Sequence, residues 1–181
     1  MVAGSAIFTA LAFAISFLEI VVFPSSAVSF LKLDFSNVFI MLAGFMYGPL
    51  SALFVGIIKE VLCILSTPSP TFGVGQLANM AIILIYVLPP SIVYLYKKGI
   101  WSVIISLSCA CILQVIGALI VNRFITFPLY GKLADFDGVA AFNASFWLLV
   151  LFNVIKSVSV SFLTIILYKR IGYIFDKINI K

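Results

Sequence analysis

The sequence contains no histidine and very little charge, and each shortage excludes a class of function. Without histidine the chain has no imidazole ligand for a metal ion and no histidine base for acid–base or triad catalysis. Charged residues make up only 9% of the 181 positions, whereas hydrophobic residues make up 64%. Soluble domains carry roughly a quarter charged residues. The composition therefore predicts an integral membrane protein.

A nucleotide-binding loop is also missing. Gly73 and Gly75 lie outside any G-x-x-x-x-G-K-[ST] frame, so we expect that the chain does not hydrolyse ATP by itself. The three cysteines, Cys63, Cys109 and Cys111, fall in apolar stretches, where we expect them to serve as packing residues. We therefore predict no catalytic residues and no metal site.

Long apolar runs predict an all-α membrane protein built as a single six-helix bundle. A membrane span needs roughly 20 residues, so the chain has room for about five or six spans and no separate soluble domain. The expected helices cover residues 3–23, 35–47, 49–66, 73–96, 100–124 and 143–169. Because no basic region or small-residue cleavage site accompanies the first run, we expect a retained span rather than a signal peptide.

Proline and glycine mark the expected boundaries between these helices. Gly48-Pro49 predicts a very tight turn before the third helix, and Pro89-Pro90 should bend the fourth. Residues 67–71 are expected to form an outer loop, and residues 127–131 a turn before the polar loop 132–137. Six spans would leave both termini on one side of the membrane.

The distribution of charge predicts which side that is. The charged residues on the side of the termini are Lys97, Lys98, Lys169, Arg170, Lys177 and Lys181, with Asp176. Those on the opposite side are Lys32, Arg123 and Lys132, with Asp34, Asp135 and Asp137. The first group is strongly basic and the second is balanced. The positive-inside rule therefore places both termini in the cytoplasm, and the net positive charge gives no reason to expect nucleic acid as a partner.

The stretch between the first two helices is a candidate lid. Residues 28–34 alternate between apolar and polar, which is typical of a short extended segment lying over the bundle. Asp34-Phe35-Ser36 follows as an N-cap region, with Asp34 at the positive end of the next helix dipole.

A lysine and three asparagines lie inside apolar helices and indicate an outward-facing pocket. A cation near the middle of an apolar helix costs at least about 2.5–3.5 kcal/mol, so Lys156 should face a protein interior or a polar cavity. Asn153 lies three residues earlier on the same helical face. Asn79 and Asn122 lie at comparable depth, with Tyr130 and the candidate lid as covers. A single asparagine more often joins two helices, but four such groups favour a binding site.

Other polar and small residues leave alternatives open. Lys59 and Glu60 are adjacent and so are expected not to face the same neighbour; we favour a position near the outer surface, or neutralisation of charges on other helices, over ligand contact. Glu19 is expected at a solvated helix end. Ala6, Ala10 and Ala14 form a small-residue stripe that either docks a partner helix or packs within the bundle.

Several motifs, taken in order, resemble a known family. They are Leu31-Lys32-Leu33-Asp34-Phe35-Ser36-Asn37-Val38, Tyr47-Gly48-Pro49, Asn122-Arg123-Phe124 leading into Pro128-Leu129-Tyr130-Gly131, and Phe152-Asn153-Val154-Ile155-Lys156. In this order they are similar to the riboflavin-specific S components, the substrate-binding subunits of energy-coupling factor (ECF) vitamin transporters. The resemblance covers nearly the whole chain.

The resemblance implies a function and a set of partners. It implies a multi-pass protein of a prokaryotic cell membrane that captures riboflavin at the outer face as a transported ligand, not a cofactor. It also implies a transmembrane coupling subunit and two cytoplasmic ATPase subunits, with the S component toppling in the bilayer to release its ligand inside. Glu60 and Arg123 depart from the family, in which uncharged or aromatic residues are expected there.

The resemblance also assigns residues to these roles. Asn122, Asn153 and Lys156 match positions that bind riboflavin through polar atoms, and the alanine stripe matches the coupling-subunit surface. The expected binding set is completed by Leu31, Leu33, Asn79 and Tyr130.

Three other functions remain as hypotheses. The same scaffold could bind another vitamin, such as pantothenate or thiamine. A membrane-embedded enzyme using Glu19 or Glu60 with Lys59 would need ionisable groups that converge on one pocket, and a stand-alone secondary transporter would be expected to show inverted repeats with broken helices. We therefore expect a transporter subunit and not an enzyme.

Overall fold

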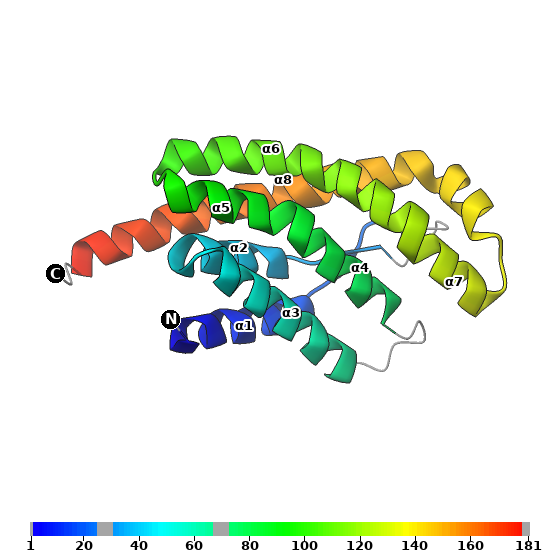
Figure 1. The fold of residues 1–181 in the computed structure, drawn as a ribbon, viewed down its shortest axis with the longest axis horizontal. Helices are drawn as coiled ribbons and strands as arrows, with labels where there is room; N and C mark the ends of the chain where they lie inside the picture. Colours follow the sequence, from blue (N-terminus) through cyan, green and yellow to red (C-terminus); the bar gives the residue numbers. More distant parts are fainter. Residues whose placement is uncertain (1, 25–30, 67–72, 179–181) are drawn as a thin grey trace.

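The computed structural model describes residues 2–24, 31–66 and 73–178, and almost all of these residues are helical (Figure 1). The helical segments are α1 (Val2–Ser16), α2 (Ser36–Tyr47), α3 (Pro49–Ser66), α4 (Val74–Ile82), α5 (Leu88–Tyr96), α6 (Ile100–Val121), α7 (Phe127–Ala134) and α8 (Gly138–Ile178). Two π-helical turns, η1 (Ile83–Val87) and η2 (Asn122–Thr126), join α4 to α5 and α6 to α7. Two short strands, β1 (Ile20–Val21) and β2 (Lys32–Leu33), form an antiparallel pair.

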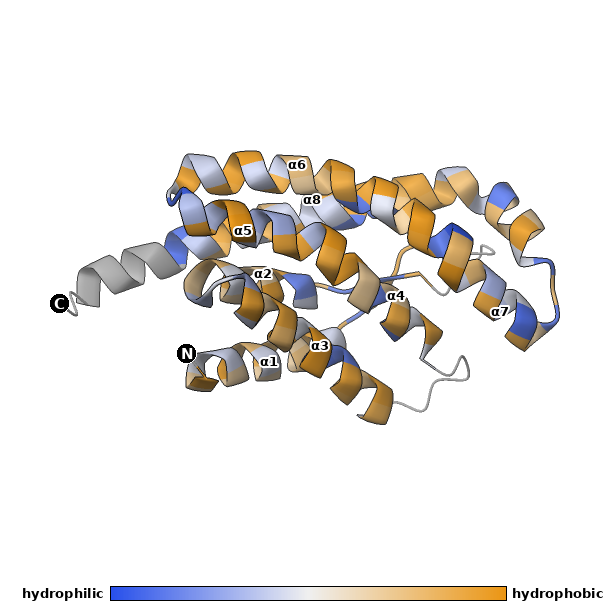
Figure 2. Cartoon of the chain, viewed as in Figure 1, coloured by the Kyte–Doolittle hydropathy of each residue, from blue (hydrophilic) through white to orange (hydrophobic). Residues whose placement is uncertain are grey.

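The lengths and hydropathy of these segments fit a membrane protein. Within the described residues, four helical stretches are long and apolar enough to cross a membrane: Pro49–Ser66, Val74–Tyr96, Ile100–Ala134 and Gly138–Arg170. Apolar residues dominate all of them (Figure 2). Helices α1 and α2 are apolar but shorter, at 15 and 12 residues. The expectation of an all-α membrane protein is therefore confirmed, whereas six full spans and cytoplasmic termini stay predictions.

Helix α2 lies at the centre of the bundle, where neighbouring helices pack against it and hold this short helix in place. Most of its side chains are buried, and Ile40, Met41 and Ala43 are completely enclosed. It packs against α1, α3, α5 and α8. Gly44 permits the closest of these approaches, because a Cβ atom there would lie 2.1 Å from the Ser91 hydroxyl oxygen on α5.

The first helix is shorter than predicted. The sequence predicts a helix over residues 3–23, but α1 ends at Ser16 and the chain continues into β1. Ile20 pairs with Leu33, and Val21 pairs with Lys32. The β-branched residues at 20 and 21 suit an extended strand, and a nearby partner strand supplies the hydrogen bonds that a helix would otherwise provide. The extended segment predicted before Asp34 is present in β2, while its beginning, residues 28–30, lies outside the described residues.

The predicted turn at residues 127–131 is also wrong. The helix expected to end at residue 124 continues through η2 into α7 and ends at Ala134. Pro128 directly follows the wider π-helical turn η2, so it interrupts the regular hydrogen-bond pattern without ending the helical segment. The chain reverses instead at Asp135, which has a left-handed φ of 54°. Gly138 permits the turn, since a Cβ there would lie 2.3 Å from the Phe127 carbonyl oxygen.

The remaining helix boundaries are close to prediction except for the last helix. Segments 36–47, 49–66 and 74–96 start within one residue of the expected positions. Helix α8 starts at Gly138 instead of residue 143, because the Asp137 carboxylate caps it by accepting hydrogen bonds from the N–H groups of Val139 and Ala140 (2.8 and 3.1 Å). It also extends to Ile178 rather than 169. The outer loop predicted at 67–71 lies outside the described residues.

Candidate ligand-binding cavity

A cavity of about 460 Å³ lies where the β1–β2 pair meets the bundle. Its walls come from the end of α1 and the residues just after it, from β2 and the flanking residues Leu31 and Asp34, from the second half of α3, from α4, from η2 and α7, and from the middle of α8. The start of α1 and the end of α8 lie at the opposite end of the bundle (Figure 1). The size is within the range of about 300–1,000 Å³ that is typical of small-molecule sites.

Most of the residues predicted to bind the ligand lie around this one cavity. Six of the seven line it: Leu31, Asn79, Asn122, Tyr130, Asn153 and Lys156. The seventh, Leu33, is buried on β2 beside the cavity lining but does not contribute to it. Four separate helical segments and the strand pair supply these side chains, so the fold, and not sequence proximity, brings them together.

The two asparagines closest to Lys156 are held in place by the helices that carry them. The Asn153 amide nitrogen donates to the Leu149 carbonyl at 2.8 Å, and its amide oxygen accepts from Gln114 on α6 at 3.3 Å. The Asn122 amide nitrogen donates to the Ala118 carbonyl at 2.7 Å. Asn153 therefore also joins two helices, which is the alternative role considered for it. Each NH₂ group carries two donors, so one donor of each remains for a ligand.

Lys156 is buried without a direct partner. Its side chain is only 6% exposed and lines the cavity. Among residues 2–24, 31–66 and 73–178, no hydrogen bond or ion pair forms to its ammonium group. An ammonium group in an apolar surrounding is costly unless it is paired. A ligand with hydrogen-bond acceptors would satisfy it.

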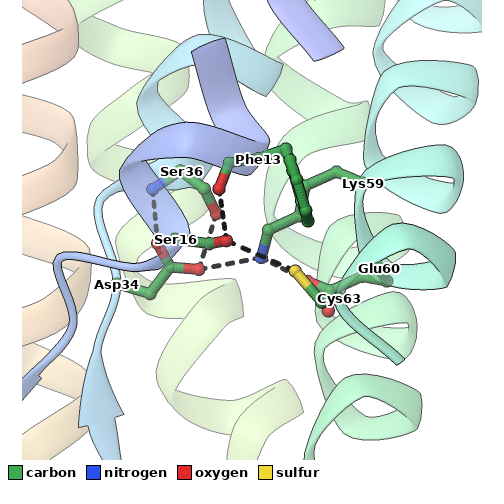
Figure 3. Close-up of polar contacts among 7 residues, drawn as sticks. All are labelled: Phe13, Ser16, Asp34, Ser36, Lys59, Glu60 and Cys63. Atoms are coloured by element: carbon green, nitrogen blue, oxygen red, sulfur yellow. Dashed lines mark hydrogen bonds and ion pairs between the residues drawn. The ribbon is translucent and has the colours of Figure 1, made fainter. Parts of the chain in front are cut away.

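Lys59, in contrast, is fully paired (Figure 3). Its ammonium group donates to Asp34 Oδ2 and to Glu60 Oε1, each at 2.9 Å. The expectation that Lys59 and Glu60 do not face the same neighbour is wrong, and neither is near the surface, because both side chains are almost completely buried. Their long, flexible side chains allow the charged groups to meet although adjacent positions point to different sides of α3. Lys59 does neutralise a charge elsewhere in the bundle, but that charge, Asp34, lies just before α2 and not on another helix as the alternative had it.

Asp34 links the strand pair to the helical bundle. It accepts hydrogen bonds from the backbone N–H of Ser36 at 2.7 Å and from the Ser36 hydroxyl at 2.6 Å, besides the ion pair with Lys59. Burial opposes ionisation of Asp34, but the Lys59 charge and the Ser36 hydrogen bonds outweigh it and hold the pKa of this carboxyl below its ordinary value. Asp34 is therefore a carboxylate at neutral pH that fixes β2 and the start of α2 against α3.

An exposed ion pair lies at the edge of the cavity. Lys32 on β2 pairs with Glu19, which precedes β1, and both side chains are well exposed. Glu19 is solvated as predicted, but it does not lie at a helix end, because α1 stops at Ser16. Because solvent screens the pair, it adds little stability, on the order of 0–1 kcal/mol.

Several cavity residues are absent from the set predicted from the sequence. They include Gln76, Thr126 and the three residues of the buried ion cluster, Asp34, Lys59 and Glu60. Within the described part of the chain, the hydroxyl oxygen of Thr126 and the second carboxylate oxygen of Glu60 are buried with no hydrogen-bond partner. The cost of burying a charge in an apolar helix, which led to the prediction for Lys156, applies equally to Lys59 and Glu60. The same signal in the sequence could have identified them as cavity residues.

The alanine stripe lies on the outside of the bundle. Ala6, Ala10 and Ala14 are all exposed, whereas Thr9 and Ala12 on the other side of α1 are buried. The stripe therefore does not pack within the described part of the bundle. Whether it docks a partner stays a prediction.

Comparisons with known proteins agree with one another. The family model for the substrate-specific component of ECF transporters matches residues 1–168. The riboflavin transporter RibU of Staphylococcus aureus (strain TCH60) is 30% identical over 174 residues, which span 94% of this chain and 89% of that protein. A solved S component of a bacterial ECF transporter superposes with a TM-score of 0.79 at 28% identity, covering 96% of both chains.

Proposed function

Because this chain belongs to the family of substrate-specific components of ECF transporters, we propose that it binds riboflavin in the cavity and delivers it for uptake. The family consists of transporter components, and the chain is a multi-pass protein of the cell membrane. The observation that carries the riboflavin proposal is that Asn122, Asn153 and Lys156 converge on one cavity. The similarity to a riboflavin transporter over nearly the whole chain supports it.

The chemistry of the cavity suits a flavin. Riboflavin has a flat ring system with carbonyl oxygens and ring nitrogens at one edge and a chain of hydroxyl groups at the other. Lys156 offers an ammonium donor for a ring acceptor, and the asparagines offer amide donors and acceptors. Leu31 and Phe152 supply apolar surface for the ring faces. A few placed polar groups in a mostly apolar pocket is the usual composition of a small-molecule site.

We place ligand capture at the outer face of the membrane. The cavity lies beneath the β1–β2 pair, at the opposite end of the bundle from the start of α1 and the end of α8 (Figure 1). The basic residues at that latter end favour a cytoplasmic position under the positive-inside rule. The strand pair would then cover the ligand from outside.

We also propose the partners of the transport complex. Membership of the family implies work with the other components of an ECF transporter. We assign these components as a transmembrane coupling subunit and two cytoplasmic ATPase subunits, with the exposed alanine stripe on α1 as the surface that meets the coupling subunit.

A titration of the purified protein with riboflavin tests the proposal. Binding should quench flavin fluorescence at micromolar or lower ligand concentration and should raise the melting temperature, because a ligand that binds only the folded state stabilises it. Pantothenate and thiamine, measured in the same thermal-shift panel, serve as comparison ligands. A shift with one of these vitamins and none with riboflavin would contradict the flavin assignment and leave the family unaffected.

A further inference from the structure

The charges around the cavity are balanced. Among the described residues that line it, three are basic and three are acidic: Lys32, Lys59 and Lys156, with Glu19, Asp34 and Glu60. The Lys32–Glu19 pair is exposed at the edge, so the other four form the buried electrostatic environment. Two buried lysines face two buried carboxylates there. A ligand with a net charge would upset this balance, whereas an uncharged polar ligand would not.

Glu60 has a specific unmet requirement within this environment. One carboxylate oxygen, Oε1, accepts a hydrogen bond from Lys59 at 2.9 Å. The other, Oε2, is buried and has no partner among the described residues, although the side chain lines the cavity and is only 1% exposed. A buried acceptor without a donor carries a desolvation penalty, and each such group calls for an explanation. The Lys59 ammonium is already shared with Asp34, so a donor from the ligand is the simplest partner for Oε2.

The requirements of Glu60 and Lys156 are complementary. Glu60 needs a ligand donor, and Lys156 needs a ligand acceptor, and the two groups lie within electrostatic range of each other. A molecule that carries both N–H or O–H groups and carbonyl oxygens but no charge meets both needs. Riboflavin 5′-phosphate keeps the ring donors and acceptors of riboflavin but adds a negatively charged group, which the carboxylates of Glu60 and Asp34 would repel.

We infer that Glu60 makes the cavity selective for uncharged riboflavin over its phosphate, by accepting a hydrogen bond from a ligand N–H or O–H group and by offsetting the positive charge of Lys59 and Lys156. The inference rests on the proposed binding of flavin in this cavity. It assigns a specificity-determining role to a residue that the family resemblance did not predict.

The test compares two ligands in three forms of the full chain. Dissociation constants for riboflavin and for riboflavin 5′-phosphate are measured by fluorescence quenching for the wild type, Glu60→Gln and Asp135→Asn. The readout is the ratio of the two constants within each protein, because a general loss of fold quality affects both ligands alike. Asp135→Asn is the matched control, as it removes the same charge from an exposed, screened position that does not line the cavity, and asparagine tolerates the left-handed φ of 54° there.

The wild type should bind riboflavin at least about tenfold more tightly than the phosphate, since placing like charges against each other is strongly unfavourable. In Glu60→Gln this preference should fall by at least about tenfold, through weaker riboflavin binding and stronger phosphate binding. Asp135→Asn should keep the wild-type ratio. A variant Glu60→Asp, which keeps the charge but shortens the reach, should lose riboflavin affinity and still reject the phosphate.

Two outcomes would overturn the inference. One is equal wild-type affinity for the two flavins, which needs no variant and so does not depend on whether Glu60→Gln folds. The other is an unchanged ratio in a Glu60→Gln protein that still binds riboflavin. Failure of the wild type to bind either flavin is a different result, because it would contradict the proposed function itself.

Discussion

Two buried lysines in this protein meet the cost of desolvation in different ways. Lys59 is bonded to two carboxylates at 2.9 Å, and these bonds tie α3 to the start of α2. Lys156 has no such partner among the described residues and faces the cavity. The difference separates a structural lysine from one available to a ligand. Removing the charge of Lys59 should therefore lower the stability of the fold, whereas removing the charge of Lys156 should weaken ligand binding.

Replacement of Lys156 by methionine is expected to weaken riboflavin binding by about 1.5–3 kcal/mol, the range for a hydrogen bond to a charged group. The fold should be retained, because methionine fills similar space and no described residue loses a partner. Fluorescence titration gives the affinity, and a melting curve without ligand gives the stability. Wild-type affinity in this variant would show that Lys156 does not contact the ligand.

The matched substitution at Lys59 should act on stability instead. Lys59→Met leaves the carboxylates of Asp34 and Glu60 buried with no cation beside them, and breaking a buried ion pair in this way costs about 3–5 kcal/mol. We expect a clearly lower melting temperature of the ligand-free protein than for Lys156→Met. Equal melting temperatures for the two variants would contradict the distinction drawn between these lysines.

The polar residues of the site could be predicted from the sequence only where the desolvation cost of each side chain was considered separately. Lys156 and Asn153 are polar within a long apolar helix, so a cavity or a partner was required. Glu60 was judged as one of two adjacent charges, and this interpretation missed that flexible side chains bring Lys59 and Glu60 together. The partner of Lys59, Asp34, lies 25 residues away, and that contact is set by the fold.

At the scale of helices and strands, glycine and proline residues gave the strongest sequence signals for where a helix begins or ends. Gly48-Pro49 marked the boundary between α2 and α3 correctly, since glycine adopts the required φ of 96° and proline suits the first helical position. Hydrophobicity alone could not separate β1 from α1, because apolar residues suit both. Pro128 was misjudged as a turn residue because a proline that follows a π-helical turn can lie within a continuous helical segment. These errors moved boundaries but not the order of elements.

The outer face of α1 leads to a prediction about assembly. Ala10→Leu should leave riboflavin affinity unchanged, because Ala10 is exposed and does not line the cavity. It should reduce recovery of the complex with the coupling and ATPase subunits, because small residues allow close helix approach and leucine prevents it. Co-purification with tagged ATPase subunits measures the effect.

A matched control comes from another helix. Ala144→Leu makes the same change at an exposed position on α8 and should not affect assembly. If both variants assemble like the wild type, the alanine stripe is not the docking surface. If both fail, the loss reflects a general effect of a larger side chain on the protein's surface.

The whole molecule is arranged as a binding subunit enclosed by lipid-facing helices. Exposed apolar residues recur along one side of α6, at Trp101, Ile105, Ile112, Ile116 and Ile120, as expected for contact with lipid. The cavity lies at one end of the bundle and the ends of the chain at the other (Figure 1). Val55, Val87 and Ala110 lie fully buried in the apolar core of the described residues. Under the proposed function, release of the ligand on the other side requires movement of the protein.

That requirement leads to a prediction for the complete transporter. In proteoliposomes, the chain alone should bind riboflavin at the outer surface but should not accumulate it, because the sequence contains no ATP-binding loop to drive the movement. Addition of the coupling subunit, both ATPase subunits and internal ATP should produce time-dependent uptake of labelled riboflavin. Complexes assembled with a Walker-lysine variant of the ATPases control for leakage. Accumulation by the chain alone would instead indicate a secondary transporter, in which the protein must open to each side of the membrane by itself.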